Sequence, residues 1–185
     1  MSALVTNLLD MARIESGEVR LRREWQPLEE VVGSALKAAH SALADHVIDV
    51  QLPRELPLVE FDATLIERVL YNLLENAAKY TPAGTSITVA AETVDGDMVV
   101  SVTDRGPGIP KGKEEAIFDK FTRGVQESAT PGVGLGLAIS RAIVEAHHGH
   151  IWATNVPDGG ARVAFTLPLG APPSTPAEAP LAAPA

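Results

Sequence analysis

Two glycine-rich runs are the residues of this chain best suited to bind a ligand through the backbone. They cover residues 104–110 (DRGPGIP) and 131–137 (PGVGLGL), and the polar segment between them contains Arg123. Glycine lacks a Cβ atom, so backbone N–H groups can approach a ligand closely and φ can be positive. The second run leads into an amphipathic segment, and the unpaired amides of a helix's first turn bind anions. The pattern predicts a nucleotide pocket with a glycine-hinged lid.

Each run on its own has an ordinary alternative explanation. An isolated Gly-Pro-Gly is most often a surface turn. The spacing also matches neither of the two common phosphate loops, because the chain has no G-x-x-x-x-G-K-[ST] and no G-x-G-x-x-G after a strand. A different kind of nucleotide site must be considered.

A helix predicted at residues 63–79 has one apolar and one polar face. Asp62 is a plausible N-cap. At 100° per residue the polar face holds Arg68, Asn72, Glu75, Asn76 and Lys79. Asparagine is a poor helix former, so two of them in mid-helix need an offsetting benefit. A ligand would supply it, and a solvated face that tolerates both asparagines is the alternative.

The remaining elements are read from apolar periodicity and turn residues. Asp95-Gly96 is the strongest hairpin signal, and Gly149 is placed to end a helix. The predicted helices are 3–16, 28–36 and 137–147, and the predicted strands are 47–52, 58–61, 87–94, 98–103, 150–155 and 162–167.

Composition limits the classes of function. The 185 residues carry a net charge of −9, which argues against sequence-independent nucleic-acid binding and means that a nucleotide would need a cation. No cysteine is present, as in a reducing compartment. No apolar run approaches the length of a membrane span and no signal peptide begins the chain, so we expect a soluble polypeptide.

Four ordered motifs together resemble the ATP-binding catalytic domain of bacterial sensor histidine kinases, the GHKL or Bergerat family. They are an N box at 70–80 (LYNLLENAAKY), two G boxes at 104–108 and 132–137, and an F box at 117–121 (IFDKF). The resemblance covers residues 25–169. More narrowly, residues 7–14, 25–36 and 131–145 resemble the potassium-responsive type of sensor kinase.

The resemblance implies a fold and a division of the chain. The fold would be α+β, a two-layer sandwich whose mixed, mostly antiparallel sheet is covered on one face by three helices, with a flexible ATP lid. Residues 1–17 would end the second helix of a dimerisation hairpin and 18–26 would be a linker. Residues 27–169 would form the ATP-binding catalytic domain, and 170–185 a disordered tail rich in proline and alanine.

The resemblance also assigns roles in the site. Asp104 would accept a hydrogen bond from the adenine amino group, and Asn72 and Asn76 would offer carbonyl oxygens to Mg²⁺. Lys79 and Arg123 would meet phosphate charge. The expected catalytic residues are Asn72, Asn76, Lys79 and Arg123. The rest of the expected nucleotide-binding set is Tyr80, Asp104, Gly106, Gly108, Ile109, Phe121, Gly132, Gly134, Leu135, Gly136 and Leu137.

Two further features bear on the reaction. In related ATPases a glutamate that activates water stands where Asn72 stands, and an amide cannot act as a general base, so transfer to a protein nucleophile is favoured over hydrolysis. The expected acceptor histidine is absent, since no histidine lies in a His-Glu-x-x-x-Pro box. His40 is expected on a helix surface. His147, His148 and His150 flank a helix end, where an imidazolium is comfortable.

The leading hypothesis is therefore the catalytic domain of a histidine kinase, an enzyme that uses ATP and Mg²⁺. Its partners would be the phosphoacceptor hairpin of a homodimeric full-length kinase and a response regulator, with no nucleic acid and no direct membrane contact by this fragment. It would be the cytoplasmic part of a membrane-attached sensor in potassium or osmotic signalling. The alternatives are an ATP-binding regulatory module without phosphotransfer, and a serine kinase or ATPase of the same fold.

Overall fold

The computed structural model describes residues 21–119, 134–157 and 159–171. The predicted helix at 3–16, the second run up to residue 133 and the tail from residue 172 lie outside them. The elements, in order, are β1 (Glu24–Gln26), α2 (Leu28–Ala38), β2 (Val47–Gln51), β3 (Val59–Phe61), α3 (Ala63–Tyr80), β4 (Ser86–Val94), β5 (Asp97–Thr103), the 3₁₀ turn η1 (Ala116–Phe118), α4 (Gly136–Ala146), β6 (Ile151–Asn155) and β7 (Ala161–Pro168).

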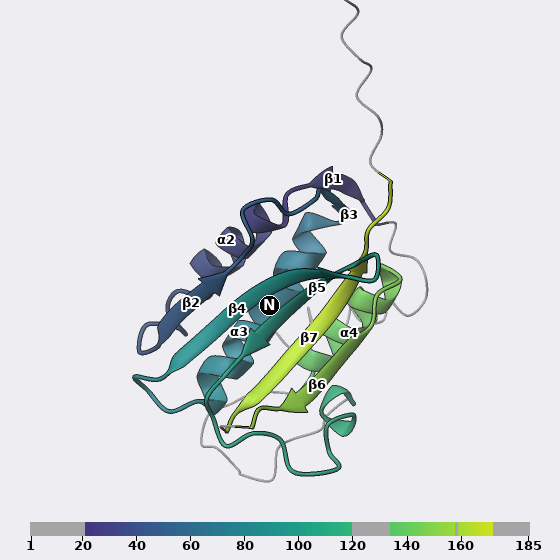
Figure 1. Ribbon diagram of the computed structural model, residues 1–185. Coiled ribbons are helices and arrows are strands. Elements are labelled where there is room, and N and C mark those ends of the chain that lie inside the picture. The colour runs from purple at the N-terminus through teal and green to yellow at the C-terminus, as the bar shows by residue number, and fades with distance from the viewer. Residues whose placement is uncertain (1–20, 120–133, 158, 172–185) are drawn as a thin grey trace, which may run out of the picture.

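The main sheet has five strands in the order β2-β4-β5-β7-β6 (Figure 1). Strand β2 pairs with β4 in parallel, and all the other neighbours in this sheet are antiparallel. A small antiparallel pair, β1 with β3, lies beside it. The predicted α+β class, with its mixed and mostly antiparallel sheet, is confirmed.

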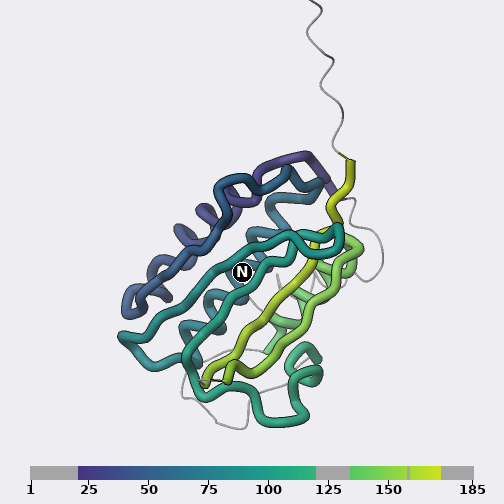
Figure 2. The backbone as a smooth tube through the Cα atoms, in the orientation of Figure 1, coloured from purple at the N-terminus to yellow at the C-terminus, as the bar shows by residue number. Residues whose placement is uncertain are grey.

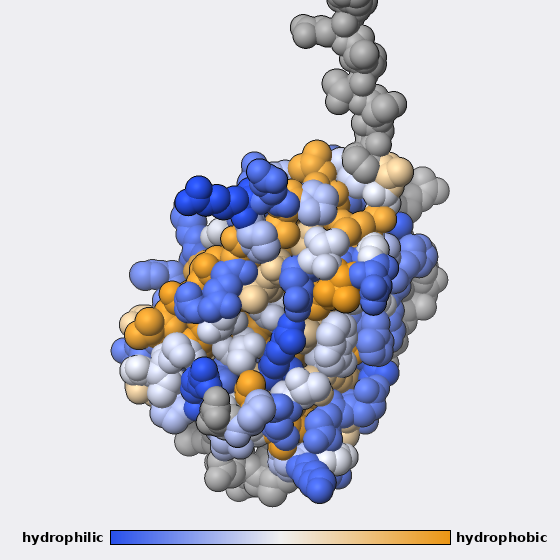
Figure 3. All heavy atoms as spheres, viewed as in Figure 1, coloured by the Kyte–Doolittle hydropathy of each residue, from blue (hydrophilic) through white to orange (hydrophobic). Residues whose placement is uncertain are grey.

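The three helices cover one face of the sheet, which confirms the predicted two-layer sandwich (Figure 2). In the first six residues of β4 every second one, Ile87, Val89 and Ala91, is buried, as the period of a strand requires, and the last three residues are exposed. The other face of the sheet is turned to the viewer in Figure 3 and mixes polar with apolar side chains. Apolar side chains gather at its β2 edge, where Val47 is 61% and Val50 is 44% exposed.

Helix α3 is the central helix and forms as its sequence predicts. The Asp62 carboxylate accepts from the Leu65 N–H, which satisfies an amide that the first turn leaves open. Its apolar face is fully packed, because six of its residues are buried: Ile66, Val69, Leu70, Leu73, Leu74 and Ala77. Asn72 and Asn76 therefore lie on the opposite, accessible side.

The turn between β4 and β5 also forms as predicted. Asp95 has φ 49° and Gly96 has φ 89°, so both central residues adopt the left-handed conformation of a type I′ hairpin. The hairpin sets the register that brings Asp104 to the end of β5.

Strand β1 lies in the segment that we predict to be a linker. Its pairing with β3 attaches residues 24–26 to the domain, and the Arg23 guanidinium donates to the Ala146 carbonyl at the end of α4, at 2.8 Å. The ideal Cβ position of Gly170 lies 3.0 Å from the Trp25 ring. The segments that enter and leave the sheet are therefore in contact.

The end of α4 differs in detail from the prediction. His148, rather than Gly149, has positive φ, at 62°. Gly149 is required for another reason, because a Cβ there would collide with the Thr166 carbonyl of β7. In the part of the chain that the structure describes, no helix combines the length and the apolar character needed to cross a bilayer.

Candidate nucleotide-binding site

Asp104 follows directly after β5, and its carboxylate is held by the backbone. Oδ1 accepts from the Gly106 N–H at 2.8 Å and from the Ala161 N–H at 3.2 Å, and the Asp104 N–H donates to the Ala161 carbonyl. These bonds fix the orientation of the carboxylate. The other oxygen, Oδ2, is the one that these two amides leave for a ligand.

The first glycine run passes so close to its neighbours that side chains would collide. A Cβ at Gly106 would lie 2.6 Å from the Tyr80 carbonyl at the end of α3. Gly108 has φ +78°, and a Cβ there would lie 2.6 Å from Oδ1 of Asn155. The glycines predicted to let the chain approach a base therefore also allow it to pack against α3 and β6.

Ile109 is held by Asn155, which the sequence does not mark as a site residue. The Ile109 N–H donates to Oδ1 of Asn155 at 2.6 Å, and the Nδ2 of Asn155 donates to the Ile109 carbonyl at 2.8 Å. Asn155 ends β6, 46 residues further along the chain. No periodicity or motif marks it.

Asn72 is joined to α4. Its Nδ2 donates to the Gly136 carbonyl at 3.1 Å and to the Ser140 hydroxyl at 3.2 Å, and that hydroxyl donates to the same carbonyl. Both amide hydrogens of Asn72 are thus used, and the carbonyl Oδ1 is the group that the side chain has left to offer. Asn76 lies one turn further along the same face of α3. An arrangement that offers amide oxygens suits Mg²⁺, which prefers oxygen ligands.

Lys79 and Tyr80 end the polar face of α3. The Lys79 ammonium lies 5.2 Å from the centre of the Tyr80 ring, within cation–π distance, and the ring is 43% exposed. This contact holds the Lys79 ammonium over the Tyr80 ring at the C-terminal end of α3. More than two turns earlier on α3, burial and then the neighbouring Glu75 carboxylate raise the pKa of Tyr71, so its hydroxyl stays a donor to Glu75.

The described part of the second glycine run leads into α4. Gly134 has φ +69°, Leu135 is buried, and helix α4 begins at Gly136 with no side-chain cap among the described residues. Residues 115–118 are attached to the domain, because Phe118 is 2% exposed and Glu115 forms an ion pair of 2.6 Å with Arg141 of α4.

His147 does not match its expectation. We expect an imidazolium at this helix end, but the ring is buried and accepts from the Asp62 N–H through Nε2, at 3.1 Å. Nδ1 lies 2.8 Å from the Ile143 carbonyl and so carries the proton. Burial lowers the pKa of His147. The expectation is wrong because His147 packs between two helices, where a charge is poorly solvated.

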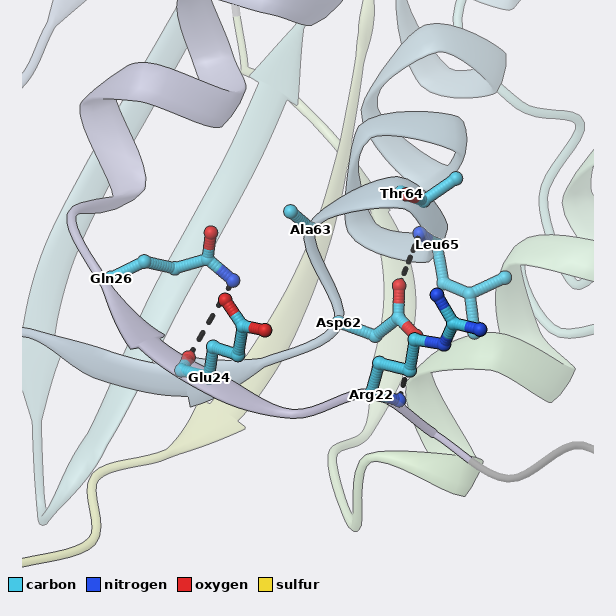
Figure 4. A pocket seen from close by; sticks show the side chains of 7 residues that line it. All are labelled: Arg22, Glu24, Gln26, Asp62, Ala63, Thr64 and Leu65. Carbon is cyan, nitrogen blue, oxygen red and sulfur yellow. Dashed lines mark hydrogen bonds between the residues drawn. The ribbon is translucent and has the colours of Figure 1, made fainter.

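A hollow of about 420 Å³ lies at the opposite end of α3 from Lys79 and Tyr80 (Figure 4). It contains none of the predicted site residues. Two of its polar side chains are hydrogen bonded, because Asp62 accepts from the Arg22 and Leu65 amides and Gln26 donates to the Phe61 carbonyl. We assign it no part in the nucleotide site.

The predicted residues thus form two groups that share α3. Around the C-terminal end of α3 lie residues expected at the base, namely Tyr80, Asp104, Gly106, Gly108 and Ile109. Around its middle, Asn72 is joined to Gly136, where the phosphates are expected. About eight residues of helix, or about 12 Å, separate Asn72 from Tyr80. Arg123, Phe121 and Gly132 lie outside the described residues. Asn155, Ser140 and Gly160, where a Cβ would collide with the Asp104 carbonyl, were missed.

This fold and site define a class of protein. Residues 61–171 match the model of the histidine kinase-, DNA gyrase B- and HSP90-like ATPase family. Because the match covers more than half of the chain, the chain belongs to this family. The predicted resemblance to sensor histidine kinase catalytic domains is confirmed.

Individual relatives narrow the class. The chain is 54% identical over 165 residues to the sensor protein KdpD of Escherichia coli (strain K12), covering 89% of this chain and 18% of that protein. It is 39% identical to the KdpD of Clostridium acetobutylicum, covering 89% of this chain and 19% of the relative. The chain therefore spans about a fifth of the length of these curated relatives. Its catalytic domain is of the KdpD-like sensor kinase type.

Solved structures of sensor histidine kinases share the fold of this chain. The mycobacterial sensor histidine kinase MprB superposes with a TM-score of 0.70 at 30% identity, over 79% of this chain and 97% of MprB. Full-length ShkA in complex with AMPPNP superposes with a TM-score of 0.79 at 27% identity, over 90% of this chain and 35% of ShkA. An ATP analogue is thus bound by a protein that contains this fold.

Proposed function

We propose that this chain binds ATP with Mg²⁺ between α3 and the second glycine run, and transfers the γ-phosphoryl group to a histidine of a partner hairpin. In that transfer the bond from the γ-phosphorus to the bridging oxygen breaks, a nitrogen–phosphorus bond forms on the imidazole, and ADP leaves. The family membership and the KdpD-like sequence support this proposal. Asp104, Gly106 and Ile109 hold the base, and Lys79 with Arg123 meets the phosphates.

One observation carries the choice of transfer over hydrolysis. The amide hydrogens of Asn72 are donated to Gly136 and Ser140, so the side chain offers a carbonyl oxygen where a hydrolase of this fold needs a base. An amide oxygen cannot take a proton from water at neutral pH. Bound Mg²⁺ would neutralise phosphate charge, and the oxygens of Asn72 and Asn76 fit the ligation that it prefers.

The rest of the proposal concerns the longer protein. Residues 1–17 would end a dimerisation hairpin, 18–26 would link it to the domain at 27–169, and 170–185 would be a tail. The full-length kinase would be a homodimer that passes the phosphoryl group to a response regulator in potassium or osmotic signalling. This part would lie in the cytoplasm, without direct membrane contact.

Calorimetric titration with a nonhydrolysable ATP analogue, with and without Mg²⁺, tests the binding step. We expect binding that Mg²⁺ strengthens and that Asp104→Ala abolishes. Labelled ATP with a separately made acceptor hairpin then tests the transfer. Label on the hairpin histidine supports the kinase. Binding without transfer would favour a regulatory module, and phosphate released without any acceptor would indicate a hydrolase.

A further inference from the structure

We propose that Asn155 is a positioning residue for the base end of the nucleotide site, acting through the backbone of Ile109. This inference rests on the proposed function, since it assigns Asn155 a role in binding the adenine ring. Asn155 makes both possible hydrogen bonds to one residue, accepting from the Ile109 N–H at 2.6 Å and donating to its carbonyl at 2.8 Å. We call this pair of bonds the Asn155 clasp.

The clasp closes on the loop that carries the expected base contacts. Ile109 is one of the walls predicted for adenine, and Asp104 lies five residues before it in the same loop. Figures 1 and 2 show this loop, after β5, passing beside the end of β6 and the turn into β7. Oδ1 of Asn155 also occupies the space that a Cβ at Gly108 would need, so the clasp explains why residue 108 has none.

The same turn holds the other end of the loop. The Ala161 N–H donates to Asp104, and a Cβ at Gly160 would collide with the Asp104 carbonyl. The loop is therefore attached to the β6–β7 hairpin at Asp104 and at Ile109. Between them, residues 105–108 contain two glycines and one proline, and within the described residues no hydrogen bond joins this inner stretch to β6 or β7. The Ile109 side chain is half-buried against the hydrophobic core, and the clasp fixes the backbone that carries it.

Releasing the clasp should weaken nucleotide binding without changing the fold. Without it the loop spends only part of its time in the binding geometry, and the apparent dissociation constant rises by the reciprocal of that fraction. We expect Asn155→Ala to weaken binding by about 5- to 10-fold, in line with the loss of two modest hydrogen bonds. Asn155→Asp should also weaken binding, although its size is unchanged, because the donor to the Ile109 carbonyl is gone.

The experiment measures three ligands by calorimetry with Mg²⁺: adenosine, ADP and a nonhydrolysable ATP analogue. Since the clasp acts at the base, Asn155→Ala should weaken all three by the same factor. Thr154→Ala, a change at the exposed preceding residue of β6, is the matched control and should bind as the parent does. Hydrogen exchange of the nucleotide-free chain gives a second readout. The Ile109 amide should exchange faster in Asn155→Ala, while the β4 and β5 amides keep their protection.

The outcomes separate this inference from the proposed function. If the parent binds nucleotide and Asn155→Ala binds all three ligands equally well, the inference is overturned, even if the melting temperature falls, because the residue then only stabilises its own hairpin. A loss confined to the ATP analogue would also overturn it, since the effect would lie at the phosphate end. If the parent binds none of the three ligands, the proposed function fails and the inference fails with it.

Discussion

Replacing Asp104 by asparagine would separate its two roles, because the two carboxylate oxygens have different neighbours. Oδ1 accepts from the Gly106 and Ala161 amides, and an asparagine oxygen can accept both of these bonds. The amide nitrogen must then replace Oδ2, because turning it the other way would place a donor against two donors. Asp104→Asn thus keeps the loop in place but presents a donor to the adenine amino group.

The magnitudes follow from these contacts. Loss of a hydrogen bond from the base to a carboxylate costs about 1.5–3 kcal/mol, or about 10- to 150-fold in the dissociation constant for ADP. Because the anchoring acceptor remains, the free energy of unfolding should change by less than about 0.5 kcal/mol. Asp104→Ala removes the acceptor as well, leaves the Gly106 and Ala161 amides without it, and should also destabilise the fold by about 1–3 kcal/mol.

Calorimetry with ADP and with inosine diphosphate, together with urea unfolding, would measure both effects. Inosine carries an oxygen where adenine carries its amino group, so the asparagine variant should lose less affinity for it than for ADP. ADP binding by Asp104→Asn equal to that of the parent would refute the assignment of Oδ2 to the base. Equal destabilisation by asparagine and alanine would refute the two-amide anchor.

Three further perturbations test other parts of the molecule. Ser140→Ala removes one hydrogen-bond partner of Asn72. Because contacts that orient a metal ligand support metal binding, it should weaken the Mg²⁺-dependent part of the affinity for an ATP analogue by about 3- to 10-fold. A variant whose affinity, measured by calorimetry, depends on Mg²⁺ as the parent's does would contradict this. Burial lowers the pKa of His147 from its usual 6.5 beside Arg23, Asp62 and His148, so the unfolded chain takes up the proton first. The free energy of unfolding should therefore fall as pH drops below about 6.5, by at most about 1.4 kcal/mol per pH unit from this group. His147→Gln should reduce the difference in the free energy of unfolding between pH 8 and pH 5.5, measured by urea unfolding, and an unchanged difference would contradict this reasoning. The Leu70 side chain is 1% exposed, so Leu70→Ala should lower the free energy of unfolding by about 2–5 kcal/mol in the same assay. Val47→Ala, at the exposed β2 edge, should lower it by less than about 0.5 kcal/mol. Similar losses in the two variants would contradict the packing.

The sequence predicts most clearly those features that depend on neighbours along the chain. Helix α3 has its cap, its apolar stripe and its polar face within one segment, and it forms as expected from Asp62 to Tyr80. The Asp95-Gly96 hairpin is equally local. The glycines of the first run are expected from a motif, and their closeness to Tyr80 and Asn155 supplies the physical reason.

Features that depend on distant neighbours could not be predicted in this way. Asn155 lies shortly before a Pro-Asp-Gly-Gly sequence, and an asparagine is common at the end of a strand. The local sequence therefore does not indicate its hydrogen bonds to Ile109. His147 has the sequence context of a solvated helix end and becomes buried only when α3 and α4 meet. Strand β1 is three residues long, too short to show an alternation.

The contact between Trp25 and Gly170 has a mechanical consequence for the domain. Both segments reach the sheet at the end where α3 begins, and the loop with Asp104 lies at the other end (Figure 1). An 18-residue helix is about 27 Å long, so the two ends are separated by most of the domain. Anything that holds the domain through these two segments contacts it at the end where α3 begins. In the proposed site the nucleotide lies toward the far end of the domain, so a small rotation about these segments would produce a large displacement of the nucleotide.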